Sequence, residues 1–154
     1  MAQKITTFLW FDNQAEEAAA FYTSLFAGSR IVSVQRPPGA EVAMTVEFEL
    51  AGQRYLALNG GPEHSFTEAV SLFVDCESQE EVDELWARLT ADGGEEGPCG
   101  WLKDRWGLSW QIIPRGLPEL LGDPDPERAR RAMKAMRSMS RIDLRAMEEA
   151  ADGR

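Results

Sequence analysis

Alternation of apolar and polar residues is clearest between residues 42 and 50. One side of this run carries Met44, Val46, Phe48 and Leu50. Thr45, Glu47 and Glu49 fall between them, which predicts a strand with one buried face and one open face. Ala51-Gly52 then joins it to a second apolar run, Gln53–Asn59, through a connection short enough for a tight hairpin.

The segments before this hairpin predict a strand, a helix and another strand. Residues 5–11 are rich in β-branched and aromatic side chains and end at Asp12-Asn13. From Gln14 to Phe26 the apolar residues recur with helical spacing, and residues 31–35 form a short strand before a Pro-Pro-Gly turn. The order is therefore βαβββ.

The same order recurs after residue 70. A strand at residues 70–75 precedes a helix that runs to about Ala91, with Ser78 as its expected N-cap and Glu81 as the capping-box partner. A short extended stretch near Glu95, a strand at 99–103 and a strand at 108–113 follow. The sequence thus predicts an α+β fold of paired βαβββ modules with a curved mixed sheet.

Beyond Pro114 the pattern becomes helical and its charge changes. Residues 1–114 carry 18 acidic and 7 basic residues, whereas residues 115–154 carry 8 and 9. Asp125-Pro126 and Asp143 are expected to start helices. We therefore predict a domain at 1–114 and a C-terminal helical extension at 115–154, whose methionine stripe packs on the body or on a dimer partner.

Composition excludes several classes of protein. A net charge of −10 argues against nucleic-acid binding, which needs basic surfaces to neutralise phosphates. No apolar run is long enough for a membrane span, and residues 1–4 lead into a strand without the apolar region of a signal peptide. The expectation is a cytoplasmic protein with neither a nucleic-acid nor a membrane partner.

Histidine and cysteine restrict the chemistry further. His64 is the single histidine, and it lies in a loop where an exposed, inert side chain is the simplest interpretation. Cys76 and Cys99 have no metal-binding or redox spacing and no neighbouring histidine in sequence. A nucleophilic role for either thiol is therefore disfavoured.

Four segments together resemble the PhnB-like family, also labelled 3-demethylubiquinone-9 3-methyltransferase-like. They are ITTFLWFD from Ile5, EEAAAFYTSLF from Glu16, MTVEFELAGQRYLALNGG from Met44 and GWLKDRWGLSWQIIP from Gly100. The resemblance spans roughly residues 4–148. It implies the glyoxalase/bleomycin resistance fold of the vicinal oxygen chelate superfamily, with a cleft and usually a homodimer.

The resemblance also implies where metal-dependent members would hold a divalent cation. By placement, these positions fall near Ile5, Glu47, Ala69 and Gln111. Only Glu47 is an anionic ligand here, and one histidine per chain cannot supply a two-histidine site. We therefore expect no metal site and no cofactor.

The expected ligand-binding residues are Glu47, Asn59, Trp101, Lys103 and Gln111. Alternation directs Glu47 and Gln111 to a cleft or to a solvated face, where an acid and an amide could orient a polar ligand. Asn59 ends a strand before Gly60-Gly61, which could equally be a plain turn. Trp101 and Lys103 alternate on one strand, although core packing is the commoner fate of a tryptophan.

Three functions remain open at this stage. One is a binder of a small polar molecule in the cleft; another is a metal-dependent enzyme of the glyoxalase or dioxygenase type. The third is the methyltransferase of the family label. The first turn, Asp12-Asn13-Gln14, lacks the glycines of a dinucleotide-type fingerprint, and Gly93-Gly94 follows a helix instead of a strand. These features disfavour the methyltransferase.

Overall fold

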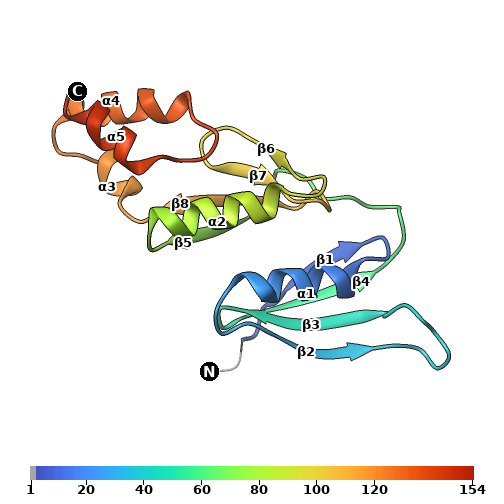
Figure 1. The fold of residues 1–154 in the computed structure, drawn as a ribbon. Coiled ribbons are helices and arrows are strands. Elements are labelled where there is room, and N and C mark those ends of the chain that lie inside the picture. The colour runs from blue at the N-terminus through green and yellow to red at the C-terminus, as the bar shows by residue number, and fades with distance from the viewer. Residues whose placement is uncertain (1–2) are drawn as a thin grey trace. The chain divides into compact units, whose positions relative to one another are not determined.

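The computed structural model describes residues 3–154 and confirms the α+β class (Figure 1). The chain forms two compact units, the first ending at Phe66 and the second spanning Thr67–Arg154. Each unit contains one four-stranded mixed sheet whose strands and helix follow the predicted βαβββ order. The paired modules are therefore present.

The first unit consists of β1 (Thr7–Phe11), α1 (Ala15–Leu25), β2 (Arg30–Gln35), β3 (Thr45–Leu50) and β4 (Gln53–Asn59). The strands lie in the order β1-β4-β3-β2, with β1 parallel to β4 and the other pairs antiparallel. Four small or aromatic residues of α1 are buried: Ala15, Ala18, Ala19 and Tyr22. They cover the face of the sheet that carries Val46 and Phe48, as the alternation predicts.

The backbone conformation of the hairpin between β3 and β4 accounts for the Ala51-Gly52 pair at its turn. Ala51 and Gly52 both adopt positive φ, at 49° and 85°. Two successive positive φ values are typical of the two-residue turn that matches the twist of antiparallel strands. Gly52 occupies this region without steric cost, whereas Ala51 carries a modest strain.

The expectation that Met44 packs in the core is wrong. Its side chain is 51% exposed. Strand β3 begins one residue later, at Thr45, and the Met44 amide donates to the Gln35 carbonyl at the end of β2. The alternation therefore continues in the sequence beyond the point where α1 covers the sheet.

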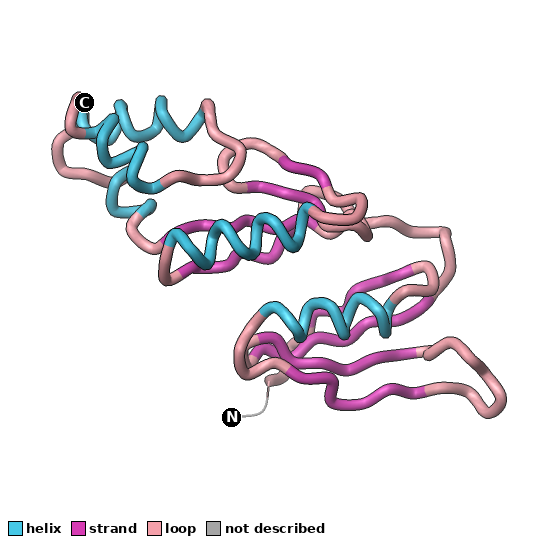
Figure 2. The backbone as a smooth tube through the Cα atoms, in the orientation of Figure 1, coloured by secondary structure: helices cyan, strands magenta, loops and turns pink. Residues whose placement is uncertain are grey.

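The second unit repeats the arrangement with β5 (Ser71–Cys76), α2 (Gln79–Thr90), β6 (Glu95–Glu96), β7 (Trp101–Lys103) and β8 (Ser109–Pro114). The strand order is β5-β8-β7-β6, and β5 runs parallel to β8. Ser78 caps α2 by accepting the Glu81 amide at 3.1 Å, which confirms the predicted cap. In each unit one helix lies along one face of the sheet (Figure 2), and the face turned away from that helix is here called the open face.

Three further helices belong to the second unit: α3 (Leu117–Leu121), α4 (Pro126–Arg137) and α5 (Leu144–Ala151). They enclose a small apolar core whose buried members are Ile113, Leu117, Ala132, Ile142, Met147 and Ala151. Met136 and Met139 of the predicted stripe pack against this core. Asp125 and Asp143 cap α4 and α5, as expected.

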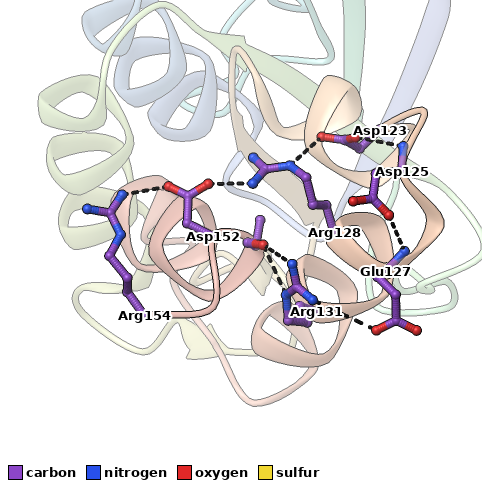
Figure 3. Close-up of polar contacts among 8 residues, drawn as sticks. Asp123, Asp125, Glu127, Arg128, Arg131, Asp152 and Arg154 are labelled. Atoms are coloured by element: carbon purple, nitrogen blue, oxygen red, sulfur yellow. Dashed lines mark hydrogen bonds and ion pairs between the residues drawn. The ribbon is translucent and has the colours of Figure 1, made fainter.

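Ion pairs connect the helices and loops of this C-terminal extension, residues 115–154, to one another (Figure 3). Arg128 of α4 bridges Asp123 and Asp152, and so joins both ends of the extension. Arg131 donates to the Ala151 carbonyl at the end of α5 through Nε, at 3.0 Å. The helices α3–α5 are thus held by charge as well as by burial.

The segment between α4 and α5 contacts the loop that leads into β7. The Cys99 and Gly100 amides donate to the Met139 and Ser140 carbonyls, each at 2.8 Å. Gly100 has a φ of +86°, and an added Cβ would lie 2.8 Å from Ile113 Cδ1. The loop therefore depends on glycine here. Separately, no helix among residues 3–154 has the length and apolar character needed to cross a membrane.

Candidate functional site

The open face of the second sheet gathers polar side chains in one row across its strands. Strand register places Glu95 of β6 opposite Lys103 of β7, and Lys103 opposite Ser109 of β8. Ser71 of β5 lies next to Ser109. Because directly opposed residues share a face with Cβ atoms about 5 Å apart, these four side chains are neighbours.

A second row on the same face contains Trp101 and Gln111. They oppose each other across β7 and β8, two residues from Lys103 and Ser109. Gln111 Nε2 donates to Ser71 Oγ at 3.0 Å, which connects the two rows. Three of the predicted ligand-binding residues, Trp101, Lys103 and Gln111, therefore share one face. The opposite face packs under α2 through Leu102, Trp110 and other apolar residues.

A cavity of about 350 Å³ opens between these strands. Its lining comprises Glu68, Glu95, Glu96, Gly97, Pro98, Trp101, Leu102, Lys103 and Ser109. The volume falls within the range of roughly 300–1,000 Å³ that small-molecule sites occupy. Every lining residue belongs to the second unit, so this unit contains the whole site.

Ser109 is the residue of this cavity that the fold leaves unsatisfied. It is only 1% exposed, and its hydroxyl oxygen has no hydrogen-bond partner in the structure. A buried hydroxyl without a partner costs about 1–3 kcal/mol. A ligand in the cavity could supply the missing hydrogen bond.

Lys103 is held at the edge of the cavity by Glu68. The two side chains form an ion pair, and Glu95 contributes a second negative charge nearby. The hydrogen bond from Lys103 lowers the pKa of Glu68, and the hydrogen bond to Glu68 raises the pKa of Lys103. Both groups are therefore charged near neutral pH, and the ammonium is already neutralised by a carboxylate.

A buried carboxylate fixes the turn between the two cavity strands. Asp104 is 2% exposed and accepts the Trp106 amide at 2.9 Å and the Leu108 amide at 3.1 Å. Its second oxygen accepts the Trp110 Nε1 proton at 2.9 Å. These bonds set the register that places Lys103 opposite Ser109.

The other two predicted ligand-binding residues, Glu47 and Asn59, lie in the first unit. Glu47 of β3 forms an ion pair with Arg54 at 2.8 Å on the open face of that sheet. Asn59 Oδ1 accepts the Ala15 amide at the start of α1, and its Nδ2 donates to the Ala43 carbonyl, both at 2.8 Å. Asn59 thus uses both ends of its amide to hold its own unit together. Ligand binding by either residue stays a prediction, as does the pairing of Glu47 with Gln111.

The four positions of the superfamily's metal site do not fit a cation in this chain. Ile5 and Ala69 are exposed and have no ligand atom in their side chains. Glu47 is paired with Arg54, and Gln111 is a neutral amide bonded to Ser71. Across residues 3–154, three or more histidine, cysteine or acidic side chains nowhere gather as a metal site would require.

The remaining reactive side chains lie outside this cavity. His64 is exposed and contacts the Trp10 ring edge-on, with 4.8 Å between ring centroids. Cys76 is fully buried, and burial raises the pKa of its thiol to about 12. A thiol with that pKa is protonated at neutral pH and is a poor nucleophile.

Sequence reasoning missed Ser109, Glu68 and Glu95. The alternation of residues 108–113 assigns Ser109 to the face of Gln111, but a serine in such a position normally indicates contact with water. Glu68 lies in a loop, so only the folded chain brings it to Lys103. Glu95 carried a detectable signal, because the short extended stretch next to β7 was predicted.

Comparisons with known proteins agree with this fold. The family model described as 3-demethylubiquinone-9 3-methyltransferase matches residues 3–113. A PhnB protein from Bacillus cereus is 40% identical, with a TM-score of 0.65; the match covers 73% of this chain and 99% of that one. No curated protein matches the chain.

More distant solved structures share the fold alone. Protein PA1353 from Pseudomonas aeruginosa is 18% identical, with a TM-score of 0.61 over 73% of this chain and 98% of that chain. The fosfomycin resistance protein FosX from Listeria monocytogenes is 19% identical, with a TM-score of 0.55 over 77% and 98%. A glyoxalase/bleomycin resistance protein from Albidiferax ferrireducens is 17% identical, with a TM-score of 0.50 over 73% of this chain and 99% of that chain, which confirms the glyoxalase/bleomycin resistance fold.

Proposed function

We propose that this chain binds a small molecule on its second sheet. The chain belongs to the PhnB-like 3-demethylubiquinone-9 3-methyltransferase family of the vicinal oxygen chelate superfamily, and the proposal starts from that membership. The binding site is the cavity between β6, β7 and β8. One observation carries the proposal: Ser109 lines this cavity, and its buried hydroxyl has no hydrogen-bond partner in the structure. Its desolvation cost is recovered when a ligand supplies a hydrogen bond.

The shape of the ligand follows from the cavity wall. Trp101 and Pro98 offer apolar surface, whereas Ser109 offers a buried hydroxyl. Such sites bind an apolar body and orient it by a few hydrogen bonds. The ligand therefore has a compact apolar part and one group that bonds to Ser109. Gln111 and Trp101 continue the same face beyond it.

Titration with benzyl alcohol, followed on backbone amide resonances, tests this proposal. We expect the resonances of Leu102, Lys103 and Ser109 to shift in a saturable way. Ser109→Val fills part of the cavity with a side chain that suits a strand, and it should abolish the shifts while the protein stays folded. Shifts confined to other segments, or unchanged binding in Ser109→Val, would refute the cavity as the site.

A metal-dependent enzyme is the alternative that the superfamily suggests. Metal analysis after dialysis decides it. Stoichiometric metal that the wild-type protein retains and the Glu47→Ala variant loses would refute the proposal that the protein is a metal-free binder. Metal below one-tenth of the protein concentration on a molar basis, with benzyl alcohol still binding, supports the binder.

The family description names a methyltransferase, which makes a third function testable. Neither sheet is a doubly wound parallel sheet, because each contains a single parallel pair. Calorimetry with S-adenosylmethionine should therefore give no binding heat at millimolar concentration. Saturable heat at one site per chain would favour the family label instead.

A further inference from the structure

The residues that line the cavity carry more negative charge than positive charge. Four of the lining residues are ionisable, and three of them are Glu68, Glu95 and Glu96. Lys103 is the remaining one, and its ammonium is taken up by Glu68. Glu96 accepts the indole proton of Trp86 and so faces α2. Glu95 is left on the open face, directly across from Lys103.

Two other features of the cavity favour a positive group. Ser109 Oγ has free lone pairs that can accept an ammonium proton. Trp101 lines the same cavity, and the faces of indole rings attract cations. An anion would instead have to displace Glu68 from Lys103 and approach Glu95.

From this arrangement we infer that the ligand is an organic cation: a compact apolar body that carries a protonated amine. The amine lies between Glu95, Ser109 and Trp101, and the apolar body contacts Pro98. This inference rests on the proposed binding function and adds the charge of the ligand to it.

Three probes of matched shape test the inference on the full chain: benzylamine, benzyl alcohol and benzoate. At pH 7 they are a cation, a neutral molecule and an anion. We expect benzylamine to bind about fivefold more tightly than benzyl alcohol, since one nearby charge contributes on the order of 1 kcal/mol at a solvated site. Benzoate should bind more weakly than both. Added salt should reduce only the preference for benzylamine.

Glu95→Gln removes the carboxylate and keeps the side-chain shape. Benzylamine should then bind about fivefold more weakly, whereas benzyl alcohol should be unaffected. Glu148→Gln is the matched control: Glu148 is exposed on α5, outside the cavity lining, and its replacement should change neither affinity.

The outcomes separate this inference from the proposed function. If benzyl alcohol shifts the cavity resonances but benzoate equals or exceeds benzylamine, the inference is wrong and the binding function stands. Equal loss of benzylamine affinity in Glu95→Gln and Glu148→Gln would also overturn it. If none of the three probes shifts the cavity resonances, both fail.

Discussion

Asp104 shows how a single buried side chain can control a site that it does not touch. Its carboxylate receives two backbone amides and one indole proton inside the turn between β7 and β8. Hydrogen bonds to a charged acceptor are among the stronger ones in proteins. The alignment of Lys103 with Ser109 therefore depends on a residue that lies outside the cavity lining.

We expect Asp104→Asn to lower the free energy of unfolding by about 2 kcal/mol. The new Nδ2 group is itself a donor and would face a donor, either a backbone amide of the turn or the Trp110 indole. Thermal and urea unfolding measure this change. In a Trp110→Phe background, which lacks the indole donor, the same substitution should cost less. An equal cost in both backgrounds would show that the Trp110 bond is not responsible.

Ser109 is predicted to trade stability for binding. Ser109→Ala removes a buried hydroxyl that has no partner, so we expect the unliganded protein to be stabilised by up to about 1 kcal/mol. Benzylamine, which can donate to the hydroxyl, should bind more weakly to the variant. Urea unfolding and calorimetry measure the two effects. A destabilised Ser109→Ala would mean that the hydroxyl already supports the fold.

At the scale of elements, the C-terminal extension fixes the loop that begins β7. The amides of Cys99 and Gly100 are bound by carbonyls between α4 and α5. Pro98 and Trp101, on either side of these two residues, line the cavity. The helices beyond residue 113, where the family match ends, thus support one wall of the site.

Gly100→Ala tests this support, and Gly107→Ala is its matched control. Both glycines have a positive φ, at +86° and +90°, but only Gly100 has close neighbours for a Cβ. Each alanine should cost about 1–2 kcal/mol for the backbone conformation, and Gly100→Ala should cost at least about 1 kcal/mol more for the clash with Ile113. Urea unfolding compares the two variants. Equal costs would show that the loop moves away freely.

The ion pairs of the extension predict a dependence of stability on pH. Hydrogen bonds from the amide of Asp125 and the guanidinium of Arg128 lower the pKa of Asp123. Hydrogen bonds from Arg128 and, to a smaller extent, Arg154 lower the pKa of Asp152. A carboxyl whose pKa is lower in the folded state contributes stability above its unfolded pKa of about 3.9 and loses it as pH falls through the folded value. Acidification below pH 4 should therefore loosen α3–α5.

Arg128→Met should lower the melting temperature at pH 7 and should change it less at an acidic pH below the folded-state pKa of its partners. Melting curves at both pH values measure the difference. Arg145→Met serves as the control, because the pair of Arg145 with Glu149 is on an exposed surface and contributes little. An equal effect of Arg128→Met at both pH values would assign it to packing instead.

The sequence predicts elements well where the determining contacts are local. The Ser78, Asp125 and Asp143 caps were all predicted correctly, because each bonds within three residues. The local pattern predicts a turn or a ligand-binding role for Asn59, but its side-chain amide caps a helix that starts 44 positions earlier. The ion pair of Glu68 with Lys103 also joins residues far apart in the sequence, so no local pattern could place the cavity.

For the whole molecule, we propose a homodimer. Phe8 and Phe73, on the open faces of the two sheets, are 52% and 58% exposed. Large exposed aromatic side chains on a sheet face are typical of surfaces that become covered in an assembly. Sedimentation equilibrium should give twice the chain mass of 17.2 kDa. Phe73→Asp should shift the equilibrium toward the single chain, and a wild-type protein that sediments at 17.2 kDa would refute the dimer.

The parallel pairs have a consequence for the order in which the chain matures on the ribosome. β1 pairs only with β4, so the first sheet can close as soon as residue 59 has left the exit tunnel. β5 pairs only with β8 and must wait for residue 114, by which time the earlier half can already be folded. During synthesis we therefore expect two successive folding events, in which the first sheet closes before the second sheet is complete.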